Sequence, residues 1–300
     1  MFKKIYLIFI LTAVFILSSC NTQNDGGQNG LRIVATLFPQ YDFAKQIAGD
    51  KAEVTLLLPP GTESHSYDPK PGDIIEIQNA DLFFYTGSAM EPWAETIIKS
   101  ISDGALKAVD CSENIKLLHN DGHNHDADPH IWLNPENAAI MAENILGALI
   151  EKDPDNADFY SVNADGYKNK LTALDQDIKD VISKAKRNAV VFGGRFAYLY
   201  FLEHFGLDYI TAYDSCAAHA EPSASQIVRV INYIKENSIP CIYYEELSDP
   251  KVARSIAEET GIEYLRFSTA HSVTKEEFQN GTGFLDIMYE NLENLKVGLN

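Results

Sequence analysis

The sequence predicts an α/β fold in which two parallel-sheet βα lobes are joined by one long helix. Two observations support this prediction. Short β-rich runs alternate with helical stretches in both halves of the chain, and no strand signal interrupts the stretch from about Asp155 to Lys186. Because repeated βα units form parallel sheets with right-handed crossovers, residues 31–152 and residues 188–300 are each expected to build a lobe.

The first half contains four β-rich runs separated by helical stretches. The runs are LRIVATLF (31–38), AEVTLLL (52–58), ADLFFYTG (80–87) and LKAVDC (106–111). Helices are expected over residues 41–50, 71–80, 91–101 and 135–152. The last of these has a typical helix start, because Asn134 can cap the helix, Pro135 suits its first position and Glu136 lies in its first turn.

An apolar stripe marks the segment between the two halves. The stripe consists of Tyr167, Leu171, Leu174, Ile178 and Val181. Their intervals of 4, 3, 4 and 3 residues are the spacing of one helix face. A helix of roughly 30 residues is roughly 45 Å long, which is enough to link two lobes. Residues 153–187 are therefore predicted to form the linking helix.

The alternation of strands and helices returns in the second half. Strands are expected in NAVVFGG (188–194), DYITAY (208–213), PCIYYEE (240–246) and EYLRFS (263–268). Helices are expected over residues 196–206, 223–238, 249–261 and 284–299. The final helix is amphipathic, so it is expected to pack one face onto a lobe.

The N-terminus carries an export signal. Lys3 and Lys4 precede an apolar run of 13 residues, which is shorter than the roughly 20 residues of a membrane-spanning helix. Residues 1–19 are therefore predicted to be a secretory signal peptide. The ending LSSC resembles a bacterial lipobox, which implies cleavage before Cys20 and attachment of lipid to its sulfur. Residues 20–30 are polar and glycine-rich, as in a flexible tether.

Charge and cysteine content restrict the possible partners. The net charge of −19 argues against nucleic acid, because phosphate binding needs a basic surface. Without Cys20, three cysteines remain, so at least one is unpaired. Cys111 and Cys241 lie in apolar stretches and are expected to be buried free thiols.

Residues that can bind a metal follow several of the predicted strands. Parallel sheets place their binding loops at the carboxyl ends of the strands, so these residues are expected to face one crevice. They are His65, Cys216, His219, Glu245 and His271, with Arg195 beside them and His130 ahead of the helix that starts at Pro135. Imidazole and thiolate ligands suit zinc and other late first-row metals. Asp128 is placed to orient the second ring nitrogen of His130.

Several motifs make the chain similar to a known family. They are SHSYDPKPGD, DPHIWLNPENA, FAYLYFLEHFGLDY, EPSASQI and the tail ENLENLKVGL. In order and content they resemble the ZnuA/TroA-like (cluster A-I) solute-binding proteins of bacterial zinc and manganese ABC transporters. The resemblance covers nearly all of residues 31–300. It implies an extracytoplasmic protein that clamps a metal ion in a cleft between the lobes and delivers it to a membrane permease.

Matched to the family pattern, His65 and His130 correspond to its first two histidine ligands. Arg195 stands where the family has its third ligand, a histidine or glutamate, and a protonated guanidinium cannot bind a cation. We expect Arg195 to turn away and pair with an acid such as Glu245 or Asp214. The aspartate that is usually the fourth ligand is missing as well, and His271 lies two or three residues beyond its place.

These departures predict a particular ligand set. His65 and His130 are expected to bind from the N-terminal lobe and His271 from the C-terminal lobe, with Cys216 or Glu245 completing the shell. The resemblance also implies that His119, His123 and His125 form a metal-collecting loop before His130, whereas the alternative is a solvated loop without a role.

Zinc is the expected ligand, since manganese prefers carboxylate oxygens and both places where the family can supply one are altered. Manganese, or a surface adhesin with metal binding, is the alternative. A secreted zinc hydrolase is disfavoured because the sequence contains no HExxH motif. The protein is therefore expected to be a lipid-anchored, monomeric metal-binding protein and not an enzyme.

Overall fold

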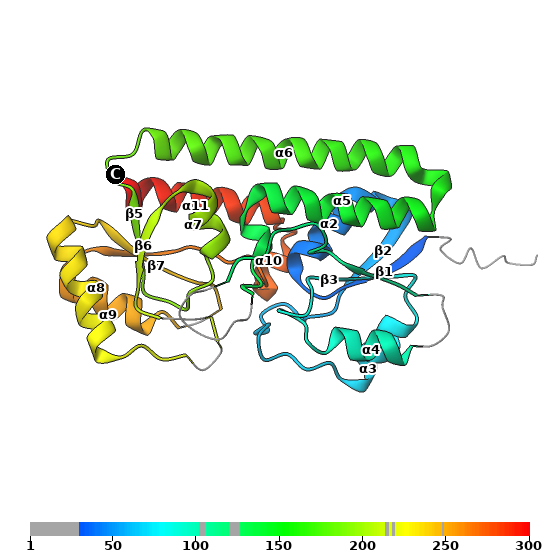
Figure 1. The fold of residues 1–300 in the computed structure, drawn as a ribbon, viewed down its shortest axis with the longest axis horizontal. Helices are drawn as coiled ribbons and strands as arrows, with labels where there is room; N and C mark the ends of the chain where they lie inside the picture. The colour runs from blue at the N-terminus through cyan, green and yellow to red at the C-terminus, as the bar shows by residue number, and fades with distance from the viewer. Residues whose placement is uncertain (1–29, 102–105, 120–126, 214–215, 218–219, 248) are drawn as a thin grey trace, which may run out of the picture. The chain divides into compact units, whose positions relative to one another are not determined.

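Two parallel four-stranded sheets organise residues 31–300 in the computed structural model (Figure 1). The structure describes residues 30–101, 106–119, 127–213, 216–217, 220–247 and 249–300. The first sheet has the order β2-β1-β3-β4 and the second the order β6-β5-β7-β8. We call the first sheet with its helices the N-lobe and the second sheet with its helices the C-lobe. The predicted α/β fold with two parallel sheets is confirmed.

The strands lie inside the predicted β-rich runs but are shorter. In the N-lobe they are β1 (Leu31–Ala35), β2 (Ala52–Leu56), β3 (Leu82–Tyr85) and β4 (Lys107–Asp110). In the C-lobe they are β5 (Ala189–Phe192), β6 (Asp208–Thr211), β7 (Cys241–Tyr244) and β8 (Glu263–Arg266). The residues that follow each strand leave the sheet as loops, and these loops carry the candidate ligands.

Helices occupy the predicted stretches. The N-lobe contains α2 (Phe38–Ala48), η1 (Gly49–Lys51), α3 (Pro71–Gln78), α4 (Ala94–Ser100), η2 (Ile131–Leu133), α5 (Pro135–Lys152) and η3 (Pro154–Asn156). The C-lobe contains α7 (Leu199–Phe205), α8 (Ala224–Asn237), α9 (Lys251–Thr260), α10 (Lys275–Gln279) and α11 (Phe284–Leu299). The Asn134 side chain accepts a hydrogen bond from the Glu136 N–H at 2.8 Å, as predicted for the cap of α5.

Four helix starts differ from their predictions by three residues or more. The helix α4 begins at Ala94 instead of residue 91, α7 at Leu199 instead of residue 196 and the linking helix at Ala157 instead of residue 153, whereas α2 begins early. The expected strand over residues 31–38 ends at Ala35, and α2 begins at Phe38 instead of residue 41. Pro39 explains the early start, because its fixed φ suits the first turn of a helix and its missing N–H is not needed there.

The long helix α6 (Ala157–Ser183) has 27 residues. It contacts α2 and α5 of the N-lobe and α11 of the C-lobe, and Figure 1 shows it running past both sheets. Its predicted stripe is buried from Tyr167 to Ile178, while Val181 is partly buried against the same core. The helix therefore packs on both lobes through one face.

The main hydrophobic core joins the two lobes. It includes Phe84 of the first sheet, Phe192 of the second sheet and Leu171 of α6. The indole N–H of buried Trp132 donates to the Thr269 carbonyl across the lobes, with an N–O distance of 2.7 Å. The predicted buried free thiols, Cys111 and Cys241, are confirmed.

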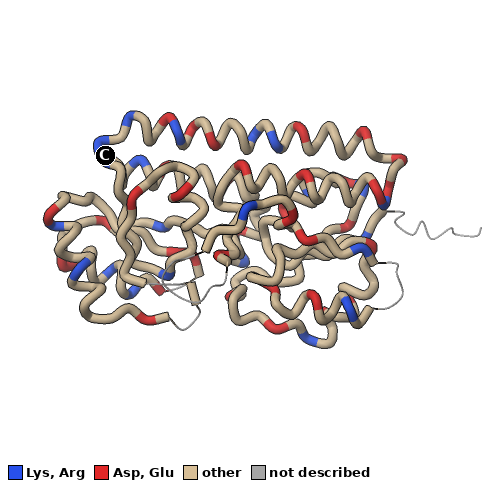
Figure 2. The backbone as a smooth tube through the Cα atoms, viewed as in Figure 1, with Lys and Arg blue, Asp and Glu red and all other residues tan. Residues whose placement is uncertain are grey.

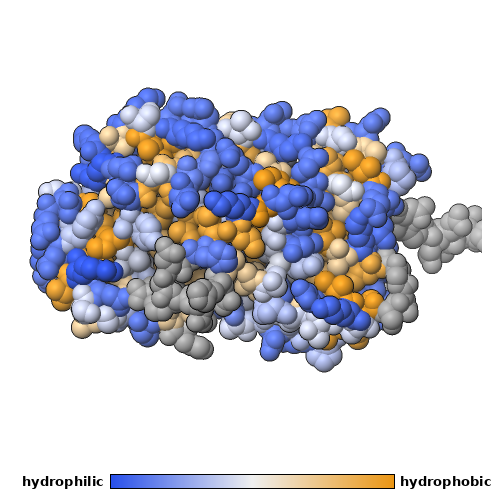
Figure 3. All heavy atoms as spheres, viewed as in Figure 1, coloured by the Kyte–Doolittle hydropathy of each residue, from blue (hydrophilic) through white to orange (hydrophobic). Residues whose placement is uncertain are grey.

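The outer surface of α6 is polar. Acidic and basic residues follow one another along it (Figure 2), and most of its side chains on the face shown in Figure 3 are hydrophilic, although Val162 and Phe159 near its start are exposed. Lys168, for example, pairs with Glu143 at 2.8 Å and with Asp165 at 3.1 Å. Within the described residues, no helix has the length and apolar character to cross a membrane.

Candidate metal centre

Six of the predicted site residues line one small cavity. These residues are His65, His130, Arg195, Cys216, Glu245 and His271, and Ala197 and Thr269 complete the lining. The cavity measures about 10 Å³, which is the space for one water-sized sphere. A metal ion fits such a space, whereas an organic ligand does not.

The loops at the carboxyl ends of the strands bring these residues together. His65 lies in the loop between β2 and α3, and His271 follows β8. Arg195, Cys216 and Glu245 follow β5, β6 and β7 in the same way. Because parallel strands end at the same edge of a sheet, short loops are enough to make these side chains converge.

Two imidazoles from the N-lobe face each other. The Nε2 atoms of His65 and His130 are 3.2 Å apart. One donor atom each of His65, His130 and Cys216 lie within 4.8 Å of one another. Ligand atoms of a tetrahedral zinc ion are separated by roughly 3.3–3.6 Å, given Zn–N and Zn–S distances of about 2.0–2.3 Å. The three side chains therefore have nearly the spacing of zinc ligands.

His130 is fixed by its neighbour Asp128. The carboxylate oxygen Oδ1 of Asp128 accepts hydrogen bonds from the His130 backbone N–H at 2.9 Å and from the ring atom Nδ1 at 3.0 Å. His130 is fully buried, so no water competes for these bonds. A proton on Nδ1 leaves the lone pair of Nε2 free to bind a metal.

His271 is held in a similar way from the C-lobe. Its Nδ1 contacts the Thr269 hydroxyl and lies 3.4 Å from the Glu246 carboxylate, which accepts from Thr269 at 2.6 Å. Its Nε2 is buried and has no hydrogen-bond partner among the residues that the structure describes. A buried polar atom without a partner is costly, and a bound cation would remove that cost.

Burial also decides the charge of the cluster. It lowers the pKa of His65 to about 2, with His130, His271 and Arg195 adding repulsion. The pKa of His271 is lowered too, chiefly by burial, although Glu246 opposes this. Both rings are therefore neutral at pH 7 and can act as ligands. Burial raises the pKa of Cys216 to about 12, so its thiol keeps its proton in the absence of a cation.

Arg195 lines the cavity beside the imidazoles and pairs with acids. Its Nε lies 3.1 Å from Oε1 of Glu245, as expected from the sequence. Its Nη2 lies 2.6 Å from Oε2 of Glu63, a partner that the sequence did not suggest. Asp214, the other predicted partner, lies outside the described residues.

Other predicted or metal-capable residues lie elsewhere. His119 forms an isolated bridge with Ala127, and His123, His125, His219 and Cys20 are outside the described residues. Donor atoms of Glu136, Asp175 and His204 also come within 4.8 Å of one another. There the Asp175 carboxylate already contacts His204 at 2.6 Å and Lys179 at 2.7 Å, so we interpret this group as an ion-pair cluster that fixes α7 on α6.

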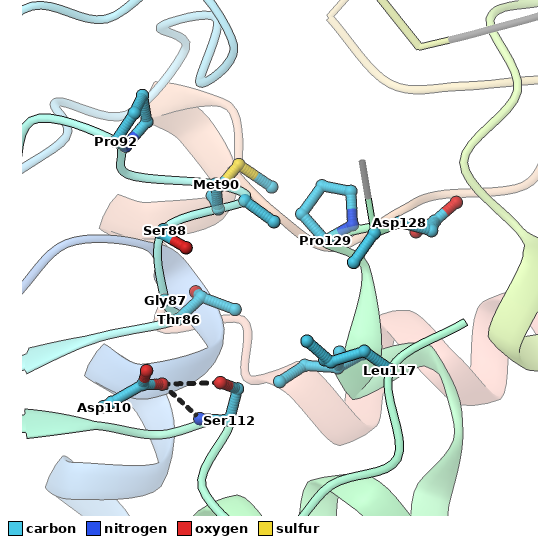
Figure 4. A pocket seen from close by; sticks show the side chains of 13 residues that line it. Thr86, Gly87, Ser88, Met90, Pro92, Asp110, Ser112, Leu117, Asp128 and Pro129 are labelled. Carbon is cyan, nitrogen blue, oxygen red and sulfur yellow. Dashed lines mark hydrogen bonds between the residues drawn. The ribbon is translucent and has the colours of Figure 1, made fainter. Parts of the chain in front are cut away.

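A larger cavity of about 520 Å³ opens where β3 and β4 end (Figure 4). Its lining includes Thr86, Met90 and Leu117 but no histidine or cysteine. Asp110, its most evident polar group, accepts two hydrogen bonds from Ser112 (Figure 4). This cavity is therefore much larger than an ion and offers no imidazole or thiol ligands from side chains.

Three residues beside the centre were not predicted from the sequence to belong to it. They are Glu63, Glu246 and Thr269. Glu63 stands two positions before His65, and its Oε1 accepts the His65 backbone N–H at 3.1 Å. Glu246 adjoins Glu245 at the end of β7. Both acids lie close in sequence to predicted ligands, and this closeness was the only hint of their role. The sequence does not show which way a side chain in a loop points.

The chain is similar over most of its length to known zinc-uptake and zinc-binding proteins. Residues 33–298 match the family model described as zinc-uptake complex component A, periplasmic. The high-affinity zinc uptake system protein ZnuA of Bacillus subtilis is 35% identical over all of this chain and 99% of its own length. The zinc-binding lipoprotein AdcA of Streptococcus pneumoniae is 33% identical over 98% of this chain, which spans 60% of AdcA.

A solved structure accounts for that partial coverage. The Zn(II)-bound ZnuA-like domain of Streptococcus pneumoniae AdcA superposes with a TM-score of 0.79 and 32% identity. The alignment covers 90% of this chain and 99% of that domain. The chain is thus similar over nearly its whole described length to a domain that was crystallised with zinc.

Proposed function

The chain belongs to the family of periplasmic component A of zinc-uptake complexes, and from this membership we propose that it captures Zn²⁺ outside the cytoplasm for an ABC transporter. Proteins of this family work with an ABC permease and are solute-binding components, not enzymes. The observation that supports the proposal most strongly is the convergence of three imidazoles and one thiol on an ion-sized cavity.

We propose that His65, His130, His271 and Cys216 bind the ion. All four line the cavity, and the two rings with lowered pKa values offer neutral nitrogens. Glu245 lines it as well, but its Oε1 and Oε2 accept from the Arg195 side chain and backbone at 3.1 and 3.0 Å. In this proposal Glu245 holds Arg195 and Cys216 is the fourth ligand.

The donor set predicts a preference for zinc over manganese. Nitrogen and sulfur ligands favour late first-row metals, whereas manganese favours oxygen ligands. We expect one Zn²⁺ to bind per protein, at least tenfold more tightly than Mn²⁺. Competition against a chromophoric chelator measures both affinities, and equal affinities would contradict this donor set.

Other parts of the chain also have proposed roles. We propose that residues 31–152 and 188–300 act as two lobes linked by residues 153–187, and that the protein works as a monomer. We also propose that His119, His123 and His125 collect metal for the centre. The support for this role is that the loop ends at Ala127, three residues before His130.

Lipid anchoring at Cys20 is the proposal for localisation. The apolar run, the LSSC sequence and the polar tether support it. Mass spectrometry of the protein from a bacterial membrane fraction is expected to show an acylated N-terminal Cys20. A Cys20→Ala variant should then appear in the soluble extracytoplasmic fraction, and an unmodified N-terminus at another residue would refute the anchor.

A further inference from the structure

Two cavities of different size share a wall. The ligand cavity measures about 10 Å³, and a second cavity of about 510 Å³ lies beside it. Glu63, Glu221 and Asp249 are among the residues that line the larger cavity. Arg195 and Glu245 line both cavities, so these two side chains separate the ligands from the larger space.

Arg195 forms ion pairs with acids from both lobes. Its Nη2 pairs with Glu63 of the N-lobe at 2.6 Å, and its Nε pairs with Glu245 of the C-lobe at 3.1 Å. Its own backbone N–H donates to Oε2 of Glu245 at 3.0 Å. Gly194 permits that approach, since a Cβ at this position would collide with the Glu245 carboxylate. The Arg195 side chain is only 14% exposed.

The wall is coupled to a proposed ligand. The Glu63 carboxylate binds Arg195 through Oε2 and accepts the His65 backbone N–H through Oε1. While the Arg195–Glu63 ion pair is formed, Glu63 therefore also links Arg195 to the loop that carries His65. Opening of that pair would free the guanidinium and loosen the same loop.

We propose that Arg195 closes the passage through which the metal ion enters and leaves the ligand cavity, an inference that rests on the proposed function. Four carboxylates line the larger cavity against two cations, Arg195 and Lys251, and this excess of negative charge attracts a dication. Arg195 then blocks its path, because a guanidinium stays protonated and cannot accept the ion as a ligand. Exchange of the ion requires the guanidinium to swing out of the shared wall.

A closing residue has a kinetic signature that a supporting residue lacks. The barrier it creates is common to entry and exit, so its removal accelerates both steps. A residue that merely supports the ligands stabilises the bound state, and its loss accelerates exit alone. The two roles are therefore separated by measuring both rate constants.

Stopped-flow mixing of the full chain with Zn²⁺, and of its zinc complex with excess chelator, tests the proposal. Arg195→Met is expected to increase both the association and the dissociation rate constant about tenfold. The Glu63→Gln/Arg195→Met double variant removes one charge of each sign and should show the same acceleration, since the amide oxygen of the glutamine can still accept the His65 N–H. Arg32→Met, which removes an arginine paired with Asp81 at 3.8 Å on β1, is the matched control and should exchange like the parent.

The outcomes distinguish this proposal from the proposed function. If the parent binds one Zn²⁺ tightly and both Arg195 variants exchange it at parental rates, the closing role is wrong and zinc capture stands. Acceleration of dissociation alone would likewise overturn the closing role. If the parent binds no Zn²⁺ in the equilibrium titration, the proposed function itself fails. Should Arg195→Met not fold, Glu63→Gln alone still breaks the pair across the lobes and is expected to accelerate both rates.

Discussion

A His271→Ala variant is expected to bind Zn²⁺ at least a hundredfold more weakly than the parent, a loss of about 2.7 kcal/mol or more. His271 is the one imidazole that the C-lobe contributes to the cavity among the described residues. Within the described part of the chain its buried Nε2 has no hydrogen-bond partner, and Thr269 and Glu246 hold the ring from its opposite side. Loss of this ring removes one of three nitrogen ligands and the main bond between the ion and the C-lobe.

Equilibrium competition with a chelator near neutral pH measures this effect. Glu245→Gln is the informative comparison, because Glu245 lines the same cavity but engages Arg195. We expect it to weaken binding by less than tenfold. Deletion of residues 119–126 should leave the tight site intact if that loop only collects metal. Parental affinity in His271→Ala, together with a large loss in Glu245→Gln, would reassign the ligand of the C-lobe.

Hydrophobic periodicity explains why the architecture could be predicted from the sequence. The repeating apolar stripe of α6 and the amphipathic pattern of α11 reflect local spacing, which the chain encodes directly. The predicted bounds of α11 agree with the structure at both ends, Phe284 and Leu299. Strand ends were less accurate, because an apolar residue after a strand can pack on the core without a partner in the sheet. Leu37 illustrates this, since it is buried beyond the end of β1.

The neighbourhood of the candidate ligands was predictable only in part. The rule that parallel strands end at one edge brought His65, Cys216 and His271 into the same region. The same rule says nothing about pairs between loops of different lobes, such as Glu63 with Arg195. It also does not choose between two adjacent acids. Glu245 pairs with Arg195, whereas the adjacent Glu246 accepts a hydrogen bond from Thr269.

Arg195 and the acids around it form one charged group beside the candidate ligands. A guanidinium near a dication costs free energy through repulsion, and two carboxylates reduce that cost. Although burial favours its protonated form, Glu63 has a lowered pKa because His271, the His65 N–H and Arg195 favour its ionised form. The Glu63 and Glu245 carboxylates both pair with the Arg195 guanidinium and so offset its charge. The proposed zinc site can therefore tolerate a guanidinium nearby.

Cys216→Ala is expected to weaken zinc binding about a hundredfold at pH 7 and to remove most of its dependence on pH. Burial, followed by the charge of Asp128, raises the pKa of Cys216 to about 12, so the free protein holds a thiol. Zinc binds the thiolate, and each ion bound must release that proton. Protons therefore compete with zinc, and the affinity of the parent should rise about tenfold per pH unit between about pH 6 and pH 8. His65, with a pKa lowered to about 2, has no proton to release in this range.

Titration of zinc affinity against pH in parent and variant isolates the contribution of the thiol, because the other ligands are common to both. Cys241→Ala is the matched control, since Cys241 is a buried thiol with a pKa raised to about 11 that does not line the cavity. It should keep both the affinity and the slope of the parent. Substitution with Co²⁺ adds a direct readout, because a cobalt–thiolate bond produces a sulfur-to-metal charge-transfer absorption. We expect this absorption in the parent and in Cys241→Ala and its loss in Cys216→Ala. If Cys216→Ala keeps the slope and the absorption, the thiol is not a ligand and Glu245 becomes the candidate for the fourth position.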